Sequence, residues 1–224
     1  MSTRLGSFVR AIDADDWPAC AGDTFAAYFQ LPRSAGMKVA VEAVARYAAT
    51  FGRAYPEISW PSDILRDPGA WVNEFGRNAD QLPPGARIAD GSWLLCLDAL
   101  LLGSSASDDV VRVAALATAT VTSIQSRAIL VWEADDPEAV ELWAGGLLKP
   151  ERSYAANAAG RAVLEREWRW TAARLTSEFG AHEPLGVDQS RLAAALERWR
   201  ANEYQLIMPA PPDGSTTAEA VTDA

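Results

Sequence analysis

Two apolar segments in the middle of the chain limit the folds that are open to it. Residues 92–102, with the sequence SWLLCLDALLL, are apolar on nearly every side when placed on a helix, and residues 110–132 form a longer run rich in Ala, Val and Thr. A helix that is apolar all round has to be buried. The longer run exceeds the usual length of a strand, and Arg112, Gln125 and Arg127 interrupt it, which favours a buried helix over a membrane span. We therefore expect a central pair of buried helices.

Helix start and stop signals place about five more helices around this pair. Asp16, Ser34 and Asp188 each precede an amphipathic stretch and are residue types that cap helix N-termini. Gly103 and Gly180 are typical of positions where a helix ends. No stretch shows the strict alternation of apolar and polar residues that a half-buried strand requires. The helices expected outside the central pair cover residues 17–30, 35–53, 136–145, 154–179 and 190–207.

The chain is therefore expected to form one all-α globular domain of about seven helices. Residues 1–208 make up this domain, since no linker interrupts them. Residues 54–87 contain five prolines and are expected to wrap around the helices, with short helical turns at 63–66 and 69–75. Residues 209–224 are rich in Pro, Thr and Ala and are expected to form a disordered tail.

The charge of the chain restricts its partners. The formal net charge is −10, and the residues after Met208 contribute three acids and no base, which leaves −7 on the expected domain. Such a surface argues against nucleic acids and anionic membranes as partners and fits a basic protein. Cys20 and Cys96 lie in apolar stretches and are expected to be buried, reduced thiols, with a disulfide or a reactive thiol as the alternative. The first residues lack an apolar signal core, so we expect a cytoplasmic protein.

The sequence contains no recognisable set of catalytic or metal-binding residues. It has nine tryptophans but a single histidine, His182, in a loop that we expect to be exposed. Helical di-iron sites need Glu-x-x-His pairs, zinc sites need Cys and His clusters, and nucleophile or phosphate-binding motifs are missing as well. Asp13, Asp15 and Asp16 lack the Gly and Glu of a calcium loop, which favours helix capping and surface charge. No catalytic residue, metal or cofactor is expected.

Asp98 is the one charged residue inside the apolar segment 92–102. Burial of a carboxylate without a partner costs several kcal/mol, so Arg112 or Arg127 on the next helix is expected to pair with it. One interpretation is an ion pair that fixes the two central helices. The alternative is a pocket that uses Asp98, Arg112 and Arg127 to bind a ligand.

An acidic segment follows the longer of the two apolar runs. It carries five acids and no base between two tryptophans, a composition that suits a solvated loop and helix or, alternatively, a contact surface for a basic protein. The candidate partner-binding residues are Trp132, Glu133, Asp135, Asp136, Glu138, Glu141 and Trp143.

Charged residues also dominate one stretch of the helix expected at 154–179. Arg161, Glu165 and Arg169 have the four-residue spacing of helical ion pairs, and together with Arg166 and Glu167 they are interpreted as a solvated face. Trp168 and Trp170 on the same helix cannot share a face. One of them is therefore expected in the core and the other against a neighbouring helix or a partner.

Three short motifs recur in a known family of helical proteins. They are Leu97-Asp98-Ala99-Leu100, Ser123-Ile124, and Leu164-Glu165 with Glu167-Trp168. Through these motifs residues 88–180 resemble the YjaG-like family of bacterial helical proteins, which has an Asp-Ala pair in an apolar helix, then a long helix of small residues, a short acidic helix and a Glu-Trp helix. The N-terminal third departs from the family around residues 25–29. The resemblance implies an all-α fold and brings no activity with it.

Three functional hypotheses follow from these observations. The first is a non-enzymatic protein that binds a basic partner, such as an immunity or antitoxin-type inhibitor that masks a basic toxin. The second is an enzyme or a small-molecule-binding protein with a Trp-lined helical pocket around Asp98. The third is a homo-oligomeric structural protein, for example a homodimer that uses tryptophan faces.

Overall fold

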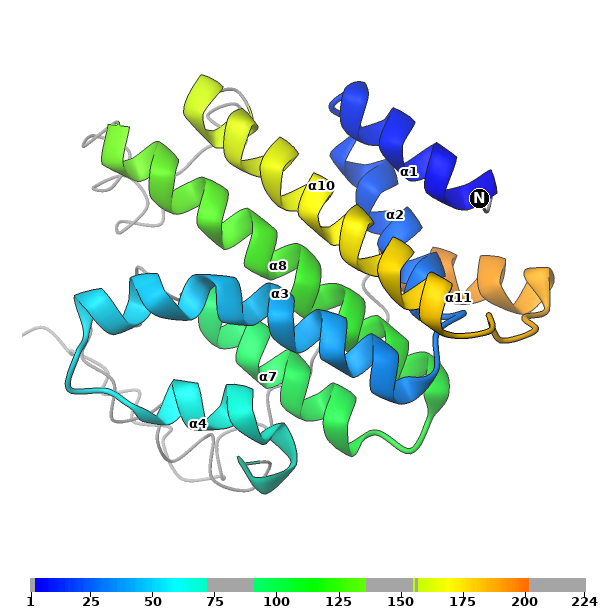
Figure 1. The fold of residues 1–224 in the computed structure, drawn as a ribbon, viewed down its shortest axis with the longest axis horizontal. Coiled ribbons are helices and arrows are strands. Elements are labelled where there is room, and N and C mark those ends of the chain that lie inside the picture. Colours follow the sequence, from blue (N-terminus) through cyan, green and yellow to red (C-terminus); the bar gives the residue numbers. More distant parts are fainter. Residues whose placement is uncertain (1–2, 72–90, 136–154, 156, 202–224) are drawn as a thin grey trace, which may run out of the picture.

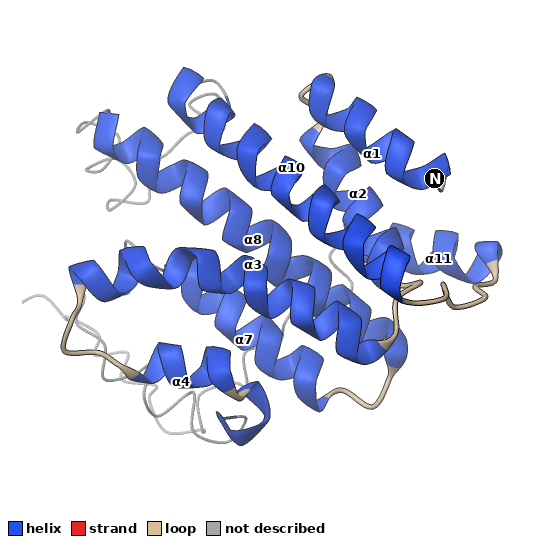
Figure 2. Ribbon diagram, in the orientation of Figure 1, coloured by secondary structure: helices blue, strands red, loops and turns tan. Residues whose placement is uncertain are grey.

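The computed structural model describes residues 3–71, 91–135, 155 and 157–201. These residues form helices and no strand, so the predicted all-α fold is confirmed (Figure 1, Figure 2). The elements are α1 (Thr3–Asp13), α2 (Trp17–Tyr28), α3 (Arg33–Ala54), α4 (Trp60–Arg66), the 3-10 helix η1 (Pro68–Trp71), α7 (Gly91–Ser105), α8 (Asp109–Asp135), α10 (Ala158–Ala181) and α11 (Gln189–Arg200).

The predicted central pair is confirmed as α7 and α8. Helix α8 contacts α2, α3, α7 and α10, and its contact with α7 is the most extensive in the fold. Leu97 and Leu100 of α7 and Ala117 of α8 are fully buried. In Figure 1, α8 ends and α10 begins at the same end of the molecule, so these two neighbours run in opposite directions. Length and composition would allow Asp109–Trp132 to span a membrane, but most of that stretch is buried inside the fold.

The helix boundaries show which local signals determine the structure. Asp16 accepts a hydrogen bond from the Ala19 backbone N–H, and Asp188 caps α11, both as predicted. The Ser34 cap is wrong, because α3 begins two residues earlier than expected, after Pro32, and has no side-chain cap. The sequence also gave no reason to expect α1, whose Phe8 and Ile12 are buried in the core. The helix expected at 136–145 and the expected tail lie outside the described residues.

Gly103 does not end the first central helix, because α7 continues to Ser105. A Cβ at position 103 would lie 2.9 Å from Leu116 Cδ2, closer than side-chain atoms approach one another. The glycine therefore allows α7 and α8 to pack closely, and the helix continues because this packing outweighs the low helix propensity of glycine.

Gly103→Val is expected to lower the free energy of unfolding by about 1–3 kcal/mol, because the new side chain has to displace Leu116 within a packed core. Gly52→Val is the matched control, since no atom lies within 4 Å of a Cβ at this position of α3. The control should unfold at the same urea concentration as the wild type or at a slightly higher one. Circular dichroism during urea unfolding measures both. A Gly103→Val protein as stable as Gly52→Val would contradict the close packing.

Candidate functional site

A cavity of about 400 Å³ lies where α3 and α8 begin. It is walled by the end of α2, the first turns of α3 and α8, and the segment between α10 and α11. Small-molecule sites in proteins typically have volumes of about 300–1,000 Å³ and are mostly apolar. The apolar part of the wall is formed by Tyr28, Phe29, Leu31, Pro32, Val113, Leu116, Leu185 and Val187.

A backbone hydrogen bond holds the outer wall of the cavity in place. The Leu185 N–H donates to the Gln30 carbonyl at 2.8 Å, which ties the segment after α10 to the turn between α2 and α3. Pro32 sits at that turn as the N-cap of α3, with an extended backbone that separates the two helices. The contact between residues 30 and 185 has no local signal in the sequence. For this reason sequence reasoning identified Arg112 as a site residue but missed the cavity it lines.

The charged residues that line the cavity are Arg33, Arg112, Arg191, Asp109 and Asp188. Basic groups therefore outnumber acidic ones here, the reverse of the whole chain, where acids exceed bases by ten. Asp188 is already engaged, because its carboxylate accepts from the Ser190 and Arg191 backbone N–H groups at the start of α11. The Arg33 guanidinium donates to the Ser104 carbonyl.

Arg112 is the most enclosed of these charges, with 12% of its side chain exposed. Its Nη1 lies 2.7 Å from Asp109 Oδ1, and its Nη2 donates to the Ala106 carbonyl at 3.3 Å. Its Nε is buried and has no hydrogen-bond partner among the described residues. An enclosed guanidinium that lines a cavity and pairs with a largely exposed carboxylate is well suited to bind an anionic ligand group.

Three helix N-termini meet at the cavity. Arg33, Asp109 and Gln189 are the first residues of α3, α8 and α11, and each lies in the cavity wall or next to a residue that does. Helix N-termini carry partial positive charge from their unpaired N–H groups. The carboxylates of Asp108 and Asp188 cap α8 and α11, whereas α3 has no side-chain cap, so among these three it is the α3 N-terminus that adds to the positive potential of the arginines.

Asp98 does not line the cavity, and it makes no hydrogen bond or ion pair with another described residue. Burial raises the pKa of its carboxyl group. Both expected partners pair elsewhere, Arg112 with Asp109 and Arg127 with Glu167. Among the described lining residues the aromatic ones are Tyr28 and Phe29, so the expectation of a Trp-lined pocket around Asp98 is replaced by a Tyr- and Phe-lined cavity around Arg112.

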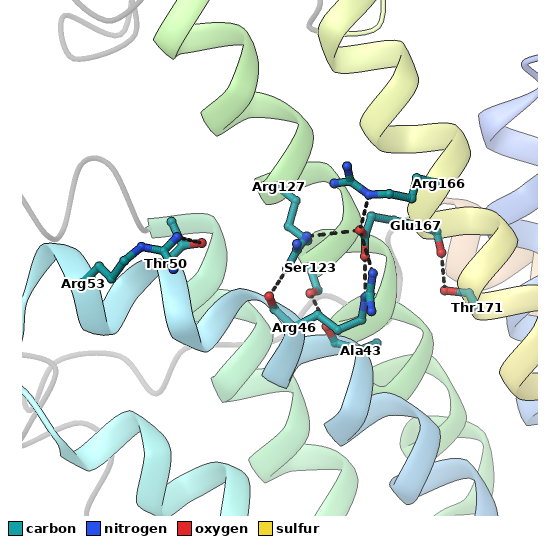
Figure 3. Close-up of polar contacts among 9 residues, drawn as sticks. All are labelled: Ala43, Arg46, Thr50, Arg53, Ser123, Arg127, Arg166, Glu167 and Thr171. Atoms are coloured by element: carbon teal, nitrogen blue, oxygen red, sulfur yellow. Dashed lines mark hydrogen bonds and ion pairs between the residues drawn. The ribbon is translucent and has the colours of Figure 1, made fainter.

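Arg127 instead belongs to a buried ion cluster that joins three helices (Figure 3). Glu167 of α10 is 2% exposed and is held by Arg46 of α3, with Nε–Oε2 and Nη2–Oε1 distances of 2.7 and 3.0 Å. Arg127 of α8 places its Nε 3.4 Å from Oε1, within ion-pair range but without hydrogen-bond geometry, and it also donates to the Arg46 carbonyl. Arg166 adds a third guanidinium at 3.1 Å.

The cluster keeps the carboxyl group of Glu167 ionised. Burial alone would raise the pKa of this carboxyl, but the hydrogen bonds and charges of Arg46, Arg127 and Arg166 outweigh burial and hold the pKa below its ordinary value of 4.5. The prediction that Glu167 belongs to a solvated face is therefore wrong. Two of its three partners, Arg46 and Arg127, lie on other helices, and the pattern within its own helix cannot reveal them.

The neighbouring tryptophans confirm the expectation that they divide between two faces. Trp168 is buried against Phe8 of α1, with ring centroids 5.9 Å apart. Trp170 is half-buried, and the Arg46 guanidinium carbon lies 4.6 Å from its ring centroid, in the arrangement of a cation–π contact.

Further ion pairs continue along α3 and α10. Lys38 lies 2.9 Å from Glu178, and the Arg174 Nε lies 2.6 Å from Glu42. The hydrogen bond from Lys38, and the nearby charges of Arg174 and His182, lower the pKa of Glu178. Successive residues of α3 thus pair with successively earlier residues of α10, which shows that the two helices are antiparallel.

The acidic groups near the N-terminus serve structural roles, as expected. Asp13 pairs with Arg169 at 2.8 Å and Asp15 pairs with Arg161, so these contacts join the end of α1 to α10. The predicted pair between Glu165 and Arg169 is present at 2.9 Å, whereas Arg161 pairs with Asp15 instead of Glu165.

The cysteines and the histidine are placed as follows. Cys20 and Cys96 are free and buried, in agreement with the sequence. Burial, followed by the charges of Asp23 and Asp16, raises the pKa of the Cys20 thiol to about 12, so this thiol stays protonated at neutral pH. His182 follows α10, half-exposed, with its Nε2 3.4 Å from Glu178.

The structure describes the first part of the acidic segment, at the end of α8. Trp132 is 5% exposed and therefore offers no ring to a partner, and Glu133 and Asp135 lie in the last turn of α8. Asp136, Glu138, Glu141 and Trp143 lie outside the described residues. Binding of a basic protein through this segment stays a prediction.

Glu167→Gln is expected to lower the free energy of unfolding at neutral pH by about 2–3 kcal/mol, because three arginines lose the buried carboxylate that pairs with them. The loss is limited because the three arginine side chains are partly exposed to water. Since the folded pKa of Glu167 is depressed, its contribution is present above the ordinary value of 4.5 and is lost as the pH falls through the folded pKa. The stability difference between wild type and variant should therefore shrink in acid.

Glu165→Gln is the matched control on the same helix, because Glu165 is 50% exposed and pairs only at the surface. It should leave the urea midpoint nearly unchanged at every pH. Two results would contradict the role assigned to the buried cluster. One is an equal loss of stability in Glu167→Gln and Glu165→Gln, and the other is a stability difference between wild type and Glu167→Gln that does not depend on pH.

Comparisons with protein-family models, with curated proteins and with solved structures found no match to this chain. The resemblance of residues 88–180 to the YjaG-like family stays a prediction. The geometry of the cavity is therefore the basis for a functional conclusion.

Proposed function

We propose that this protein binds a small, largely apolar molecule in the cavity between α2, α3, α8 and the segment after α10. The observation that carries the proposal is the cavity itself, about 400 Å³ of space whose wall combines apolar side chains with charged ones, among them one enclosed arginine. A pocket of this size that combines apolar side chains with a few polar groups is typical of a small-molecule site.

The lining favours binding over catalysis. Its described residues include no Ser, Thr, Cys, His or Lys side chain that could act as a nucleophile or a base. The Tyr28 hydroxyl is hydrogen-bonded to Thr120 at 2.6 Å, and burial raises its pKa, so it stays neutral. Asp109 is paired with Arg112 and Asp188 caps α11, so each carboxylate already has a partner in the fold.

The size of the cavity sets the expected affinity. A ligand of about 12 non-hydrogen atoms that gains about 0.5 kcal/mol per atom binds with a dissociation constant on the order of tens of micromolar. Decanol and decanoate have this size and are suitable probes. Isothermal titration calorimetry should detect binding of at least one of them, and hydrogen exchange should slow at residues 183–188 when it binds.

Leu185→Asp is expected to weaken probe binding about tenfold, because it removes part of the apolar wall and adds a charge to it. Leu185 is 50% exposed, so the substitution should not unfold the protein. Leu95→Asp is the matched control, since Leu95 is 44% exposed on α7 and does not line the cavity. Absence of binding by both probes, or equal weakening by the two substitutions, would overturn the proposal.

A further inference from the structure

The charged groups of the cavity narrow the class of ligand. We infer that the ligand is an apolar molecule with one carboxylate, and that this carboxylate takes the place of Asp109 on the Arg112 guanidinium. The inference rests on the proposed function and adds to it the sign of the ligand charge and the residue that recognises it.

Arg112 supplies the recognition. It lies in the first turn of α8 and in the cavity wall, and its three nitrogens are used unequally by the protein. Nη1 is paired with Asp109, Nη2 has the Ala106 carbonyl at the long distance of 3.3 Å, and the buried Nε has no partner among the described residues. A guanidinium binds a carboxylate through its N–H donors, and the group that pairs with Asp109 is available to a ligand carboxylate that replaces Asp109.

Asp109 forms an ion pair with the same guanidinium that a ligand carboxylate can replace. Its side chain is 74% exposed at the mouth of the cavity, and it pairs with Arg112 from three residues away on the same helix. Because Asp109 is the exposed member of the pair, water competes for its carboxylate, and its side chain loses rotamer freedom while it is paired. A ligand carboxylate whose apolar part fills the cavity gains apolar burial in addition, so it can displace Asp109.

The surroundings favour an anion over a cation or a neutral group. The N-termini of α3, α8 and α11 converge on this end of the bundle, and α3 has no side-chain cap to offset its partial charge. Arg33 and Arg191 lie in the wall as exposed side chains and add positive potential at the mouth. A single enclosed guanidinium matches one carboxylate, and apolar side chains line much of the rest of the cavity.

The test compares probes that differ only in their head group. Decanoate, decanol and decylammonium are titrated into the wild-type protein by calorimetry at two salt concentrations. Decanoate is expected to bind about tenfold or more tightly than decanol, and decylammonium least tightly. Equal binding of decanoate and decanol would overturn the carboxylate inference and leave the proposed function standing. Absence of binding by all three would overturn the proposed function itself.

Two substitutions with opposite expected effects on decanoate binding test whether Arg112 binds the carboxylate. Arg112→Gln should weaken decanoate binding about 10- to 100-fold and leave decanol binding unchanged, because it removes a charge-assisted hydrogen bond. Asp109→Asn should strengthen decanoate binding about two- to fivefold, because it removes the competing carboxylate. If Arg112→Gln fails to fold, Asp109→Asn and the comparison of the three probes on the wild-type protein still test the inference. Unchanged or weaker decanoate binding by a folded Asp109→Asn protein would contradict the displacement.

The chain contains a matched control for both substitutions. Asp63 and Arg66 form an ion pair with the same three-residue spacing on α4, at 3.0 Å, and neither residue lines the cavity. Asp63→Asn and Arg66→Gln change the net charge of the protein by the same amounts. They should leave decanoate binding unchanged, and an effect equal to that of the cavity variants would mean that overall charge, and not Arg112, determines affinity.

Discussion

A single buried carboxylate fixes the arrangement of the helices on which the cavity depends. Glu167 of α10 is almost completely removed from water, which costs several kcal/mol unless its charge is paired. Its partners Arg46 and Arg127 come from α3 and α8, so the three helices have to meet at one point for the carboxylate to be satisfied. A shift of α10 by one turn, about 5.4 Å, would leave buried charges unpaired. The cluster therefore selects one register among several that apolar packing alone would accept.

The same register shapes the opposite end of the bundle. From Arg46 towards the start of α3, the antiparallel pairing continues through Glu42 with Arg174 and Lys38 with Glu178. These pairs bring the end of α10 beside the start of α3, where the next segment can reach the turn after α2 and form its backbone hydrogen bond. The cavity is the space enclosed by this connection. The position of the cavity walls therefore depends on ion pairs between α3 and α10 that do not themselves line the cavity.

Features determined within one helix were predictable from the sequence, and features determined between helices were not. Asp16 and Asp188 cap the helices that follow them because capping involves only neighbouring residues. Gly103 was expected to end a helix, but its role depends on Leu116 of another helix. The site is an exception to this division. Arg112 was expected to pair with Asp98 of the facing helix, but its carboxylate partner is Asp109, one turn away on its own helix.

An anion site in an acidic protein has to satisfy two conditions. It must attract an anion despite the net charge of −10, and it must be stable when empty. Charges more than about 10 Å away are largely screened at physiological salt, so the local arginines and helix N-termini dominate at the cavity. An enclosed guanidinium without a counter-charge would destabilise the empty protein. Asp109 supplies that charge from an exposed position, at a modest cost in ligand affinity, and this explains why a carboxylate stands at the mouth of a site built to bind another one.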